Sequence, residues 1–441
     1  MRKGKRVALA VSVASGLATL YAAGRVATAY WDFGAAAGEL PKALREYRAA
    51  GLPWSAAEVA PSHLDAGENP AAALRAAGKM LHPGPKGDLT QAIRNPGPAS
   101  DALVVGYAKP LALVEAVADR PRVDFARDWD LGPYILFPEY ADMKTLAKAA
   151  VLRAVRSAGK GDDTAALRDL TLARRLGLWA DQEPTLISVL VRIAIESIAI
   201  DGAERCVAAA AGSPGRIARY EGWLDLALRP PDFRNALRGE AWMGVTTARN
   251  LEAFGGKDTL WSLARGDMNV RLPKIDPTKL RREGLPDGVT ARGFLARHLQ
   301  LWNEASRTTD GFRQPPESVG KRLDAIEMRI ETEKGLSYVY DRIMMAVFGG
   351  AGEAVTTLDA RRAVGRGFAE AMAFHAKRGT WPLKVSQTDP FTGSPLRVKA
   401  GKDFRVYSVG RDRKDDGGVL HREAKPGTKG EDLVAAYPPV S

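Results

Sequence analysis

Turn residues and short strand-like runs alternate near the C-terminus of the chain, and this order limits what the segment can fold into. Pro382 ends a long helical pattern, because proline lacks an amide hydrogen and disfavours helix in the residue before it. Asp389 and Pro390 begin a turn. Residues 396–399 and 404–409 are then typical of the two strands of a hairpin. The segment therefore predicts a helix, a proline-rich turn, a hairpin and an acidic loop, in that order.

The predicted hairpin needs a partner, because two strands alone are only marginally stable in water. We expect its apolar side chains to pack against the helix that ends near Arg378. Those side chains are Phe391, Leu396, Phe404, Val406 and Tyr407. Helix and hairpin would then form one small α+β module.

Four motifs mark this segment. They are Gly379–Pro382, Asp389–Pro395, Tyr407–Asp412 and Asp415–Gly418. Their order, over about residues 354–420, resembles the globular head of type II secretion pseudopilins. The resemblance implies a helix, a small sheet and a loop that can hold calcium. Thr392 makes the second motif one residue longer than in that family, and the N-terminus lacks the peptidase site and glutamate that open a pseudopilin. We therefore expect a reused terminal module rather than a filament subunit.

Segments outside the tail carry a second resemblance. They are Leu52–Pro61, Glu68–Ala72 and Arg238–Ala241. Together with the layout of anchor, helical middle and tail, they resemble uncharacterised envelope proteins of planctomycete-type bacteria. This resemblance implies an envelope location and carries no established activity with it.

The N-terminus suits a membrane element. Residues 2–6 read Arg-Lys-Gly-Lys-Arg, and residues 7–23 are uncharged and mostly apolar. Residues 7–31 fit a retained anchor in which Arg25 snorkels to the interface. A signal peptide cleaved near Ala27 also fits. Both place the bulk outside the cytoplasm, and the anchor, which we favour, predicts a single pass through the inner (cytoplasmic) membrane with a cytoplasmic start.

Helical periodicity dominates the middle of the chain. Residues 184–211 repeat apolar side chains at helical spacing, and residues 99–118 are expected as one helix kinked at Pro110. Short breaks between helices favour antiparallel neighbours. The pattern predicts a mainly α fold with an antiparallel helical-hairpin array similar to tetratricopeptide proteins. The expected domains are an anchor or signal segment (1–31), N-terminal helices and linkers (32–135), the helical array (136–350) and the pseudopilin-like module (351–441).

The acidic loop after the hairpin is the candidate metal site. The pseudopilin resemblance implies that Asp412, Asp415 and Asp416 hold calcium together with backbone carbonyls, and such oxygen ligands suit this ion. A second interpretation is an Asp/Gly turn whose charges are solvated. The neighbouring cations Arg411, Arg413 and Lys414 favour the second interpretation, because they offset the negative field.

Charge and cysteine content restrict the partners. The formal net charge is +12, but basic and acidic residues alternate along the helices. We therefore expect a basic surface beside anionic lipid or cell wall and no nucleic-acid partner. The single cysteine, Cys206, excludes an intrachain disulfide.

The sequence carries no catalytic motif. Its five histidines are scattered, and Glu196 and Glu240 are expected in buried ion pairs with Arg192 or Arg238 rather than in acid–base chemistry. The favoured hypothesis is a non-enzymatic, membrane-anchored envelope protein that binds a protein or peptide partner on its helical surface. The alternative is an envelope hydrolase whose site lies in the helical region without a recognisable motif.

Overall fold

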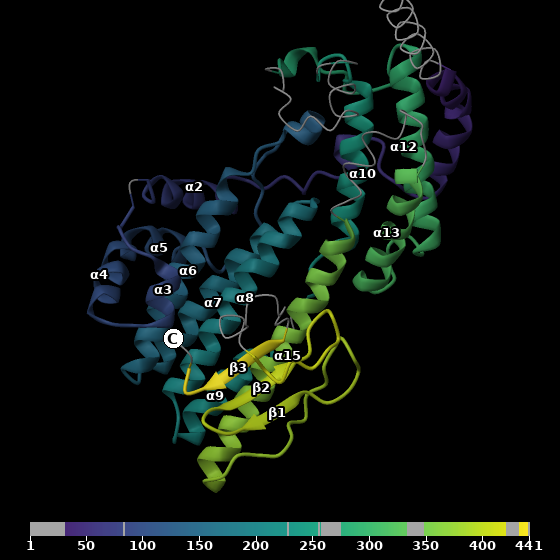
Figure 1. Cartoon of the computed structure of the whole chain (residues 1–441). Coiled ribbons are helices and arrows are strands. Elements are labelled where there is room, and N and C mark those ends of the chain that lie inside the picture. The colour runs from purple at the N-terminus through teal and green to yellow at the C-terminus, as the bar shows by residue number, and fades with distance from the viewer. Residues whose placement is uncertain are drawn as a thin grey trace, which may run out of the picture. The chain divides into compact units, whose positions relative to one another are not determined.

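The computed structural model of the chain is mainly helical and carries a small antiparallel sheet near its C-terminus (Figure 1). The structure describes residues 31–82, 84–226, 229–254, 256, 275–332, 348–419 and 432–439. The predicted anchor, residues 1–31, falls almost entirely outside this range. Within the described ranges, no helix combines the length and apolarity that crossing a bilayer requires. The predicted mainly α fold is confirmed.

Contacts between residues divide the chain into two compact units, each built from separated stretches of sequence. The first unit comprises residues 1–60, 128–135 and 237–349. The second comprises residues 61–127, 136–236 and 350–441. The tail therefore belongs to the same unit as the central helices.

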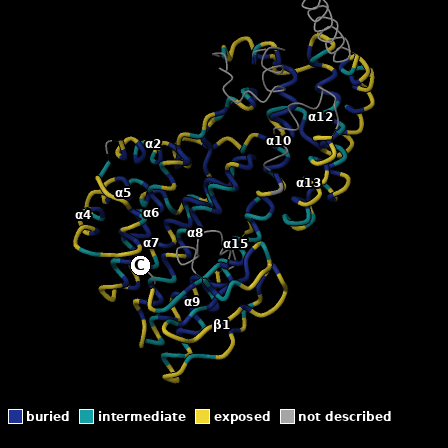
Figure 2. The backbone as a smooth tube through the Cα atoms, in the orientation of Figure 1, coloured by how far each residue is buried: buried dark blue, intermediate teal, exposed yellow. Residues whose placement is uncertain are grey.

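Three long helices form the centre of the second unit: α6 (Pro138–Gly159), α7 (Asp163–Ala180) and α8 (Leu186–Ala209). All three pack on one another, and Gly202 lets α8 approach α6 so closely that a Cβ there would clash with the side chain of Val151. Asp162 caps α7 by accepting a hydrogen bond from the amide of Ala165. Buried residues recur along all three helices, as the dark blue stretches of the backbone show (Figure 2).

Shorter helices surround this centre. They are α2 (Ala71–Lys79), α3 (Leu89–Arg94), α4 (Pro98–Gly106), α5 (Ala108–Glu115) and α9 (Pro214–Asp225). The prediction of one helix over residues 99–118, kinked at Pro110, is wrong. The helix instead breaks at Tyr107, and Pro110 lies in the first turn of α5, where its missing amide hydrogen leaves no helical bond unmade.

The last helix, α15 (Phe348–Arg378), separates the central helices from the sheet. A Cβ at Gly365 would lie 3.2 Å from Ile200 of α8. A Cβ at Gly367 would lie 3.2 Å from the side chains of Leu396 and Val406, on the sheet side. Two residues turn a helix by about 200°, so these glycines face opposite neighbours.

Among the described residues the sheet has three strands, in the order β1 (Arg397–Ala400), β2 (Phe404–Ser408) and β3 (Leu433–Tyr437). Both pairings are antiparallel, and Val406 is opposite Val398 in β1 and Ala435 in β3. The predicted hairpin is confirmed, whereas β3 was not predicted. The five side chains expected to form its apolar face are all buried: Phe391, Leu396, Phe404, Val406 and Tyr407.

Stacked rings join the end of α15 to the sheet. The ring of Trp381 lies between His375 of α15, at 3.9 Å, and Phe404 of β2, at 4.1 Å between centroids. Gly379, with φ of 73°, makes the sharp turn that brings Trp381 back over the helix. The first tail motif thus has a local physical role: a glycine turns the chain and an aromatic ring fills the gap.

The first unit contains a helix over residues 31–49, the part of α10 (Phe233–Arg249) from Leu237 onward, α12 (Val289–Thr308) and α13 (Pro316–Thr332). Three short 3-10 helices accompany them: η1 (Ala56–Glu58), η2 (Trp129–Tyr134) and η3 (Pro277–Lys279). The guanidinium of Arg249 lies 4.4 Å from the ring of Trp54 and 5.1 Å from that of Trp242. This stacking ties the N-terminal segment to α10.

The close approach at Gly367 generates a first prediction. Gly367→Leu should destabilise the second unit by about 1–3 kcal/mol, because the added side chain would overpack the contact between α15 and the sheet. Gly350→Leu is the matched control in the same helix, since a Cβ there meets nothing within 4 Å. Thermal melting of both variants checks this, and equal shifts would contradict the packing described.

Candidate functional site

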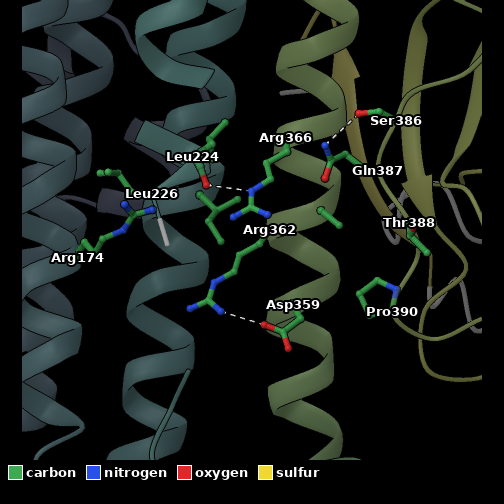
Figure 3. Close-up of a pocket in the computed structure, with 12 residues that line it drawn as sticks. Arg174, Leu224, Leu226, Asp359, Arg362, Arg366, Ser386, Gln387, Thr388 and Pro390 are labelled. Atoms are coloured by element: carbon green, nitrogen blue, oxygen red, sulfur yellow. Dashed lines mark hydrogen bonds and ion pairs between the residues drawn. The ribbon is translucent and has the colours of Figure 1, made fainter. Parts of the chain in front are cut away.

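A pocket of about 470 Å³ lies in the second unit, between α15, the central helices and the turn that follows Trp381 (Figure 3). Arg174, Arg362 and Arg366 line it together with one acidic residue, Asp359. Apolar and neutral side chains complete the wall: Ile200, Leu224, Leu226, Ala363, Ser386, Gln387, Thr388 and Pro390. The pocket thus joins a basic wall to apolar ones.

Arg174 extends from α7 and is 6% exposed. Its Nη1 donates to the carbonyl of Trp223 at 3.1 Å, and its guanidinium lies 3.5 Å from the Trp223 ring. Its buried Nε has no hydrogen-bond partner, and among the described residues no carboxylate forms an ion pair with Arg174. Burial lowers the pKa of Arg174 to about 10, and the charge of Glu196 offsets only part of this effect.

Arg362 and Arg366 lie one turn apart on α15, so both face the same side. Arg362 donates to Glu196 at 2.8 Å and to Asp359 at 2.9 Å, which neutralises it. Arg366 donates from Nε to the carbonyl of Leu224 at 3.1 Å and lies 3.3 Å from the half-exposed carboxylate of Asp225. Arg174 is therefore the arginine of this wall that lacks a carboxylate partner.

The turn that forms the opposite wall is held by one buried carboxylate. Asp389 is 2% exposed and accepts hydrogen bonds from the amides of Phe391 and Val409, both at 2.9 Å. It also accepts one from the hydroxyl of Ser408 at 3.0 Å. Asp389 thereby joins the second tail motif to the third, and it fixes the position of Thr388 and Pro390 in the pocket wall.

The predicted calcium ligands do not converge in the described residues. Asp412 accepts from the amide of Lys414 at 3.0 Å. Asp415 accepts from the hydroxyl of Tyr407 at 3.1 Å, and its second oxygen lies 3.6 Å from Arg397.

Asp416 lies near another carboxylate, because its amide is 3.5 Å from an oxygen of Asp432. Across the described ranges, no group of three or more His, Cys, Asp or Glu side chains is placed to hold a metal ion. Calcium binding by Asp412, Asp415 and Asp416 stays a prediction.

Asp432 adds negative charge to the same loop. Its carboxylate accepts from the amide of Gly418 at 2.8 Å. Burial, together with the charges of Asp416 and Asp415, raises the pKa of Asp432 to about 6. The sequence pattern did not relate Asp432 to the loop, because the two are separated by residues 420–431, which lie outside the description.

The predicted pairing of Glu196 is confirmed, with an additional partner. Its carboxylate lies 3.6 Å from Arg192 and accepts from Arg362 at 2.8 Å. Glu240 belongs to the first unit, as does Arg238, which donates to the carbonyl of Gly51. The sequence therefore indicated the buried pairing of Glu196 but missed Arg362, although its spacing from Arg366 places both on one helix face.

No family model, curated protein or solved structure matches the chain. The resemblances to pseudopilin heads and to planctomycete-type envelope proteins therefore remain predictions from the motifs alone.

The bonds of Asp389 generate a second prediction. Asp389→Ala should destabilise the second unit by about 3 kcal/mol, because it removes a buried carboxylate and leaves its buried donors unpaired. Asp412→Ala is the control, since Asp412 accepts one exposed bond and should cost about 0.5 kcal/mol or less. Thermal melting compares them, and a similar cost for both would contradict the organising role of Asp389.

The raised pKa of Asp432 generates a third prediction, on pH. Since its pKa in the folded state exceeds the value of 3.8 for a free side chain, its neutral form favours folding, and that contribution is lost as the pH rises through about 6. Asp432→Asn stays neutral, so its melting temperature should rise relative to wild type between about pH 4 and pH 7.

Asp403→Asn is a control of opposite sign. The bond from Arg405 lowers the pKa of Asp403, so its charged form stabilises the fold above the ordinary aspartate pKa, and the contribution is lost as the pH falls through the lowered value. This variant should therefore melt below wild type at pH 7, with the difference shrinking toward acid. A pH-independent offset for Asp432→Asn would show that its carboxylate does not titrate as described.

Proposed function

We propose that the protein is a non-enzymatic, membrane-anchored binding protein of the bacterial envelope. Its helices would offer a surface for a protein or peptide partner, and its C-terminal module would act as a pseudopilin-like head. The observation that carries this proposal is the pocket of about 470 Å³, because both the helices and the tail turn contribute to it. Pockets of this size suit a small ligand or the end of a peptide.

The state of the buried carboxylates supports binding over catalysis. Burial raises the pKa values of Glu183, Asp169 and Asp181, which is the environment expected of a catalytic acid. However, Glu183 pairs with Arg127 at 2.6 Å and Asp169 with Arg153 at 2.8 Å, while Asp181 pairs with the buried Arg192. The Asp169–Arg153 pair joins α7 to α6, the Asp181–Arg192 pair joins the end of α7 to α8, and the Glu183–Arg127 pair joins two segments outside the helices, as structural ion pairs do.

The finer fold assignments belong to the same proposal. The central helices α6, α7 and α8 follow one another through short connections, which supports a tetratricopeptide-like array. The order of α15, the Asp389 turn and the sheet supports the pseudopilin-like head. The anchor and the inner-membrane address rest on the basic start and apolar run of residues 2–31.

The alternative, an envelope hydrolase, would depend on Asp359. It is the one carboxylate among the residues that line the pocket, and burial raises its pKa. A general acid usually works with a second carboxylate, a histidine or a nucleophile. Asp359 instead pairs with Arg362 at 2.9 Å, and this pairing favours the binding protein.

A fourth prediction tests this function. After alkaline carbonate washing, the full chain should remain with the membrane fraction, because an apolar anchor resists extraction. Purified from that fraction in detergent, it should show no turnover of ester, peptide or glycoside substrates, and Asp359→Asn should behave as wild type.

Two outcomes contradict the proposal separately. Recovery in the soluble cytoplasm would refute the anchor. Turnover that disappears in an Asp359→Asn variant with an unchanged melting temperature would establish the hydrolase, and Asp225→Asn, which changes another acid near Arg366, is the matched control for that loss.

A further inference from the structure

We propose that the arginine-lined pocket binds an oxyanion, a carboxylate or phosphate group, carried on a small apolar body, and that Arg174 supplies the opposite charge. The inference rests on the proposed binding function and names the chemistry of its ligand.

The first step in the argument is the charge of Arg174. A guanidinium that is 6% exposed has lost most of its hydration, and such a charge is costly unless an anion or several acceptors compensate it. In the described residues its direct contacts are one carbonyl and one aromatic face, both from Trp223. Its Nε has no partner. The pocket therefore contains a buried cation whose donors exceed the acceptors around it.

Helix capping explains only part of this arrangement. Arg174 and Arg366 donate to the carbonyls of Trp223 and Leu224, in the last turn of α9, where cations are favourable. Capping accounts for Nη1 of Arg174 and Nε of Arg366. Capping does not account for the unpartnered Nε of Arg174. It also does not explain why both arginines lie beside a cavity, where guanidinium groups can bind an oxyanion.

The neighbouring ion pairs direct the anion toward Arg174. Arg362 is engaged by Glu196 and Asp359, so it screens the pocket from their negative charge. Arg366 has a nearby carboxylate in Asp225, but the side chain of that residue is 56% exposed and its attraction is weakened by water. A bound anion would therefore pair with Arg174, whose charge is uncompensated, and contact Arg366 beside it.

The remaining wall determines what carries the oxyanion. Ile200, Leu224, Ala363 and Pro390 line the pocket with apolar surface. Figure 3 shows Arg366 and Arg174 on the helix side and Thr388 and Pro390 on the tail side. A free inorganic ion would leave this apolar surface uncovered, whereas an apolar residue with a terminal carboxylate, or an apolar phosphoester, would cover it.

Titration calorimetry on the detergent-solubilised full chain tests the proposal. N-acetyl-leucine should bind and its uncharged analogue N-acetyl-leucinamide should not, because only the first carries a carboxylate. Phenyl phosphate is the second probe, and inorganic phosphate should compete with both. Tighter binding of N-acetyl-leucine would identify a peptide carboxylate as the ligand, and tighter binding of phenyl phosphate a phosphoester; each outcome supports the oxyanion site.

Variants locate the site. Arg174→Gln should weaken binding at least tenfold, and Arg366→Gln should weaken it several-fold. Arg361→Gln is the matched control, because Arg361 lies on the same helix and pairs with Asp201 outside the pocket, so binding should be unchanged. Thermal melts establish that each variant is folded. If Arg174→Gln does not fold, Arg366→Gln alone decides the test.

Equal binding by wild type and both pocket variants, or no binding of either anion at millimolar concentration, would overturn the proposal. A chain that stays in washed membranes without turnover but binds no anion would refute the pocket assignment and leave the proposed function standing. A chain that binds anions at Arg174 and also hydrolyses them through Asp359 would refute the proposed function and leave the pocket standing.

Discussion

The carboxylate of Asp389 is the interaction on which the tail and the pocket both depend. It is buried, and its two oxygens accept bonds from the turn that contains it and from the end of β2. Backbone contacts also hold this turn, through the bridge between Thr388 and Pro395 and the bond from the amide of Leu396 to the carbonyl of Gln387, but the bonds of Asp389 are the ones that join it to the end of β2. Because Thr388 and Pro390 line the pocket, one side chain that touches no ligand determines the shape of the site.

A second constraint is that α15 must satisfy two neighbours. Gly365 faces α8 and α9, whereas Gly367 faces the sheet, and both approaches are too close for an ordinary side chain to be added without adjustment. Glycine inside a helix is costly by about 1 kcal/mol relative to alanine, so two of them within three residues indicate that close packing compensates. Two arginines of the pocket, Arg362 and Arg366, lie on the same stretch of α15, where the helix is fixed on both sides.

The local sequence pattern predicted the helices and the hairpin because their signals are local. Pro382 and Gly379 end α15 where expected, and Asp162 caps α7. The helix break at Tyr107 was missed because proline is tolerated in a first helical turn, so Pro110 could not identify the break.

β3 was missed since Leu433–Tyr437 follows a long polar stretch and its pairing with β2 is set by tertiary packing, not by a hairpin turn. The grouping of residues 61–127, 136–236 and 350–441 into one unit is likewise a long-range property.

The candidate site shows the same division between local and long-range information. The acidic loop could be found from sequence because its residues are adjacent, yet adjacency does not make carboxylates converge on one point, and in the described residues Asp415 is directed toward Tyr407 and Arg397. The pocket has the opposite character. Arg362 and Arg366 share a helix face, but Arg174 is distant in sequence and is recognised only because its burial leaves it without a carboxylate. A solvated arginine and a buried one look identical in the sequence. The difference in their hydration free energy arises only when the chain packs around one of them. Such sites are therefore found by examining which charged side chains are buried and which of them lack an oppositely charged partner. The residue pattern alone cannot reveal them.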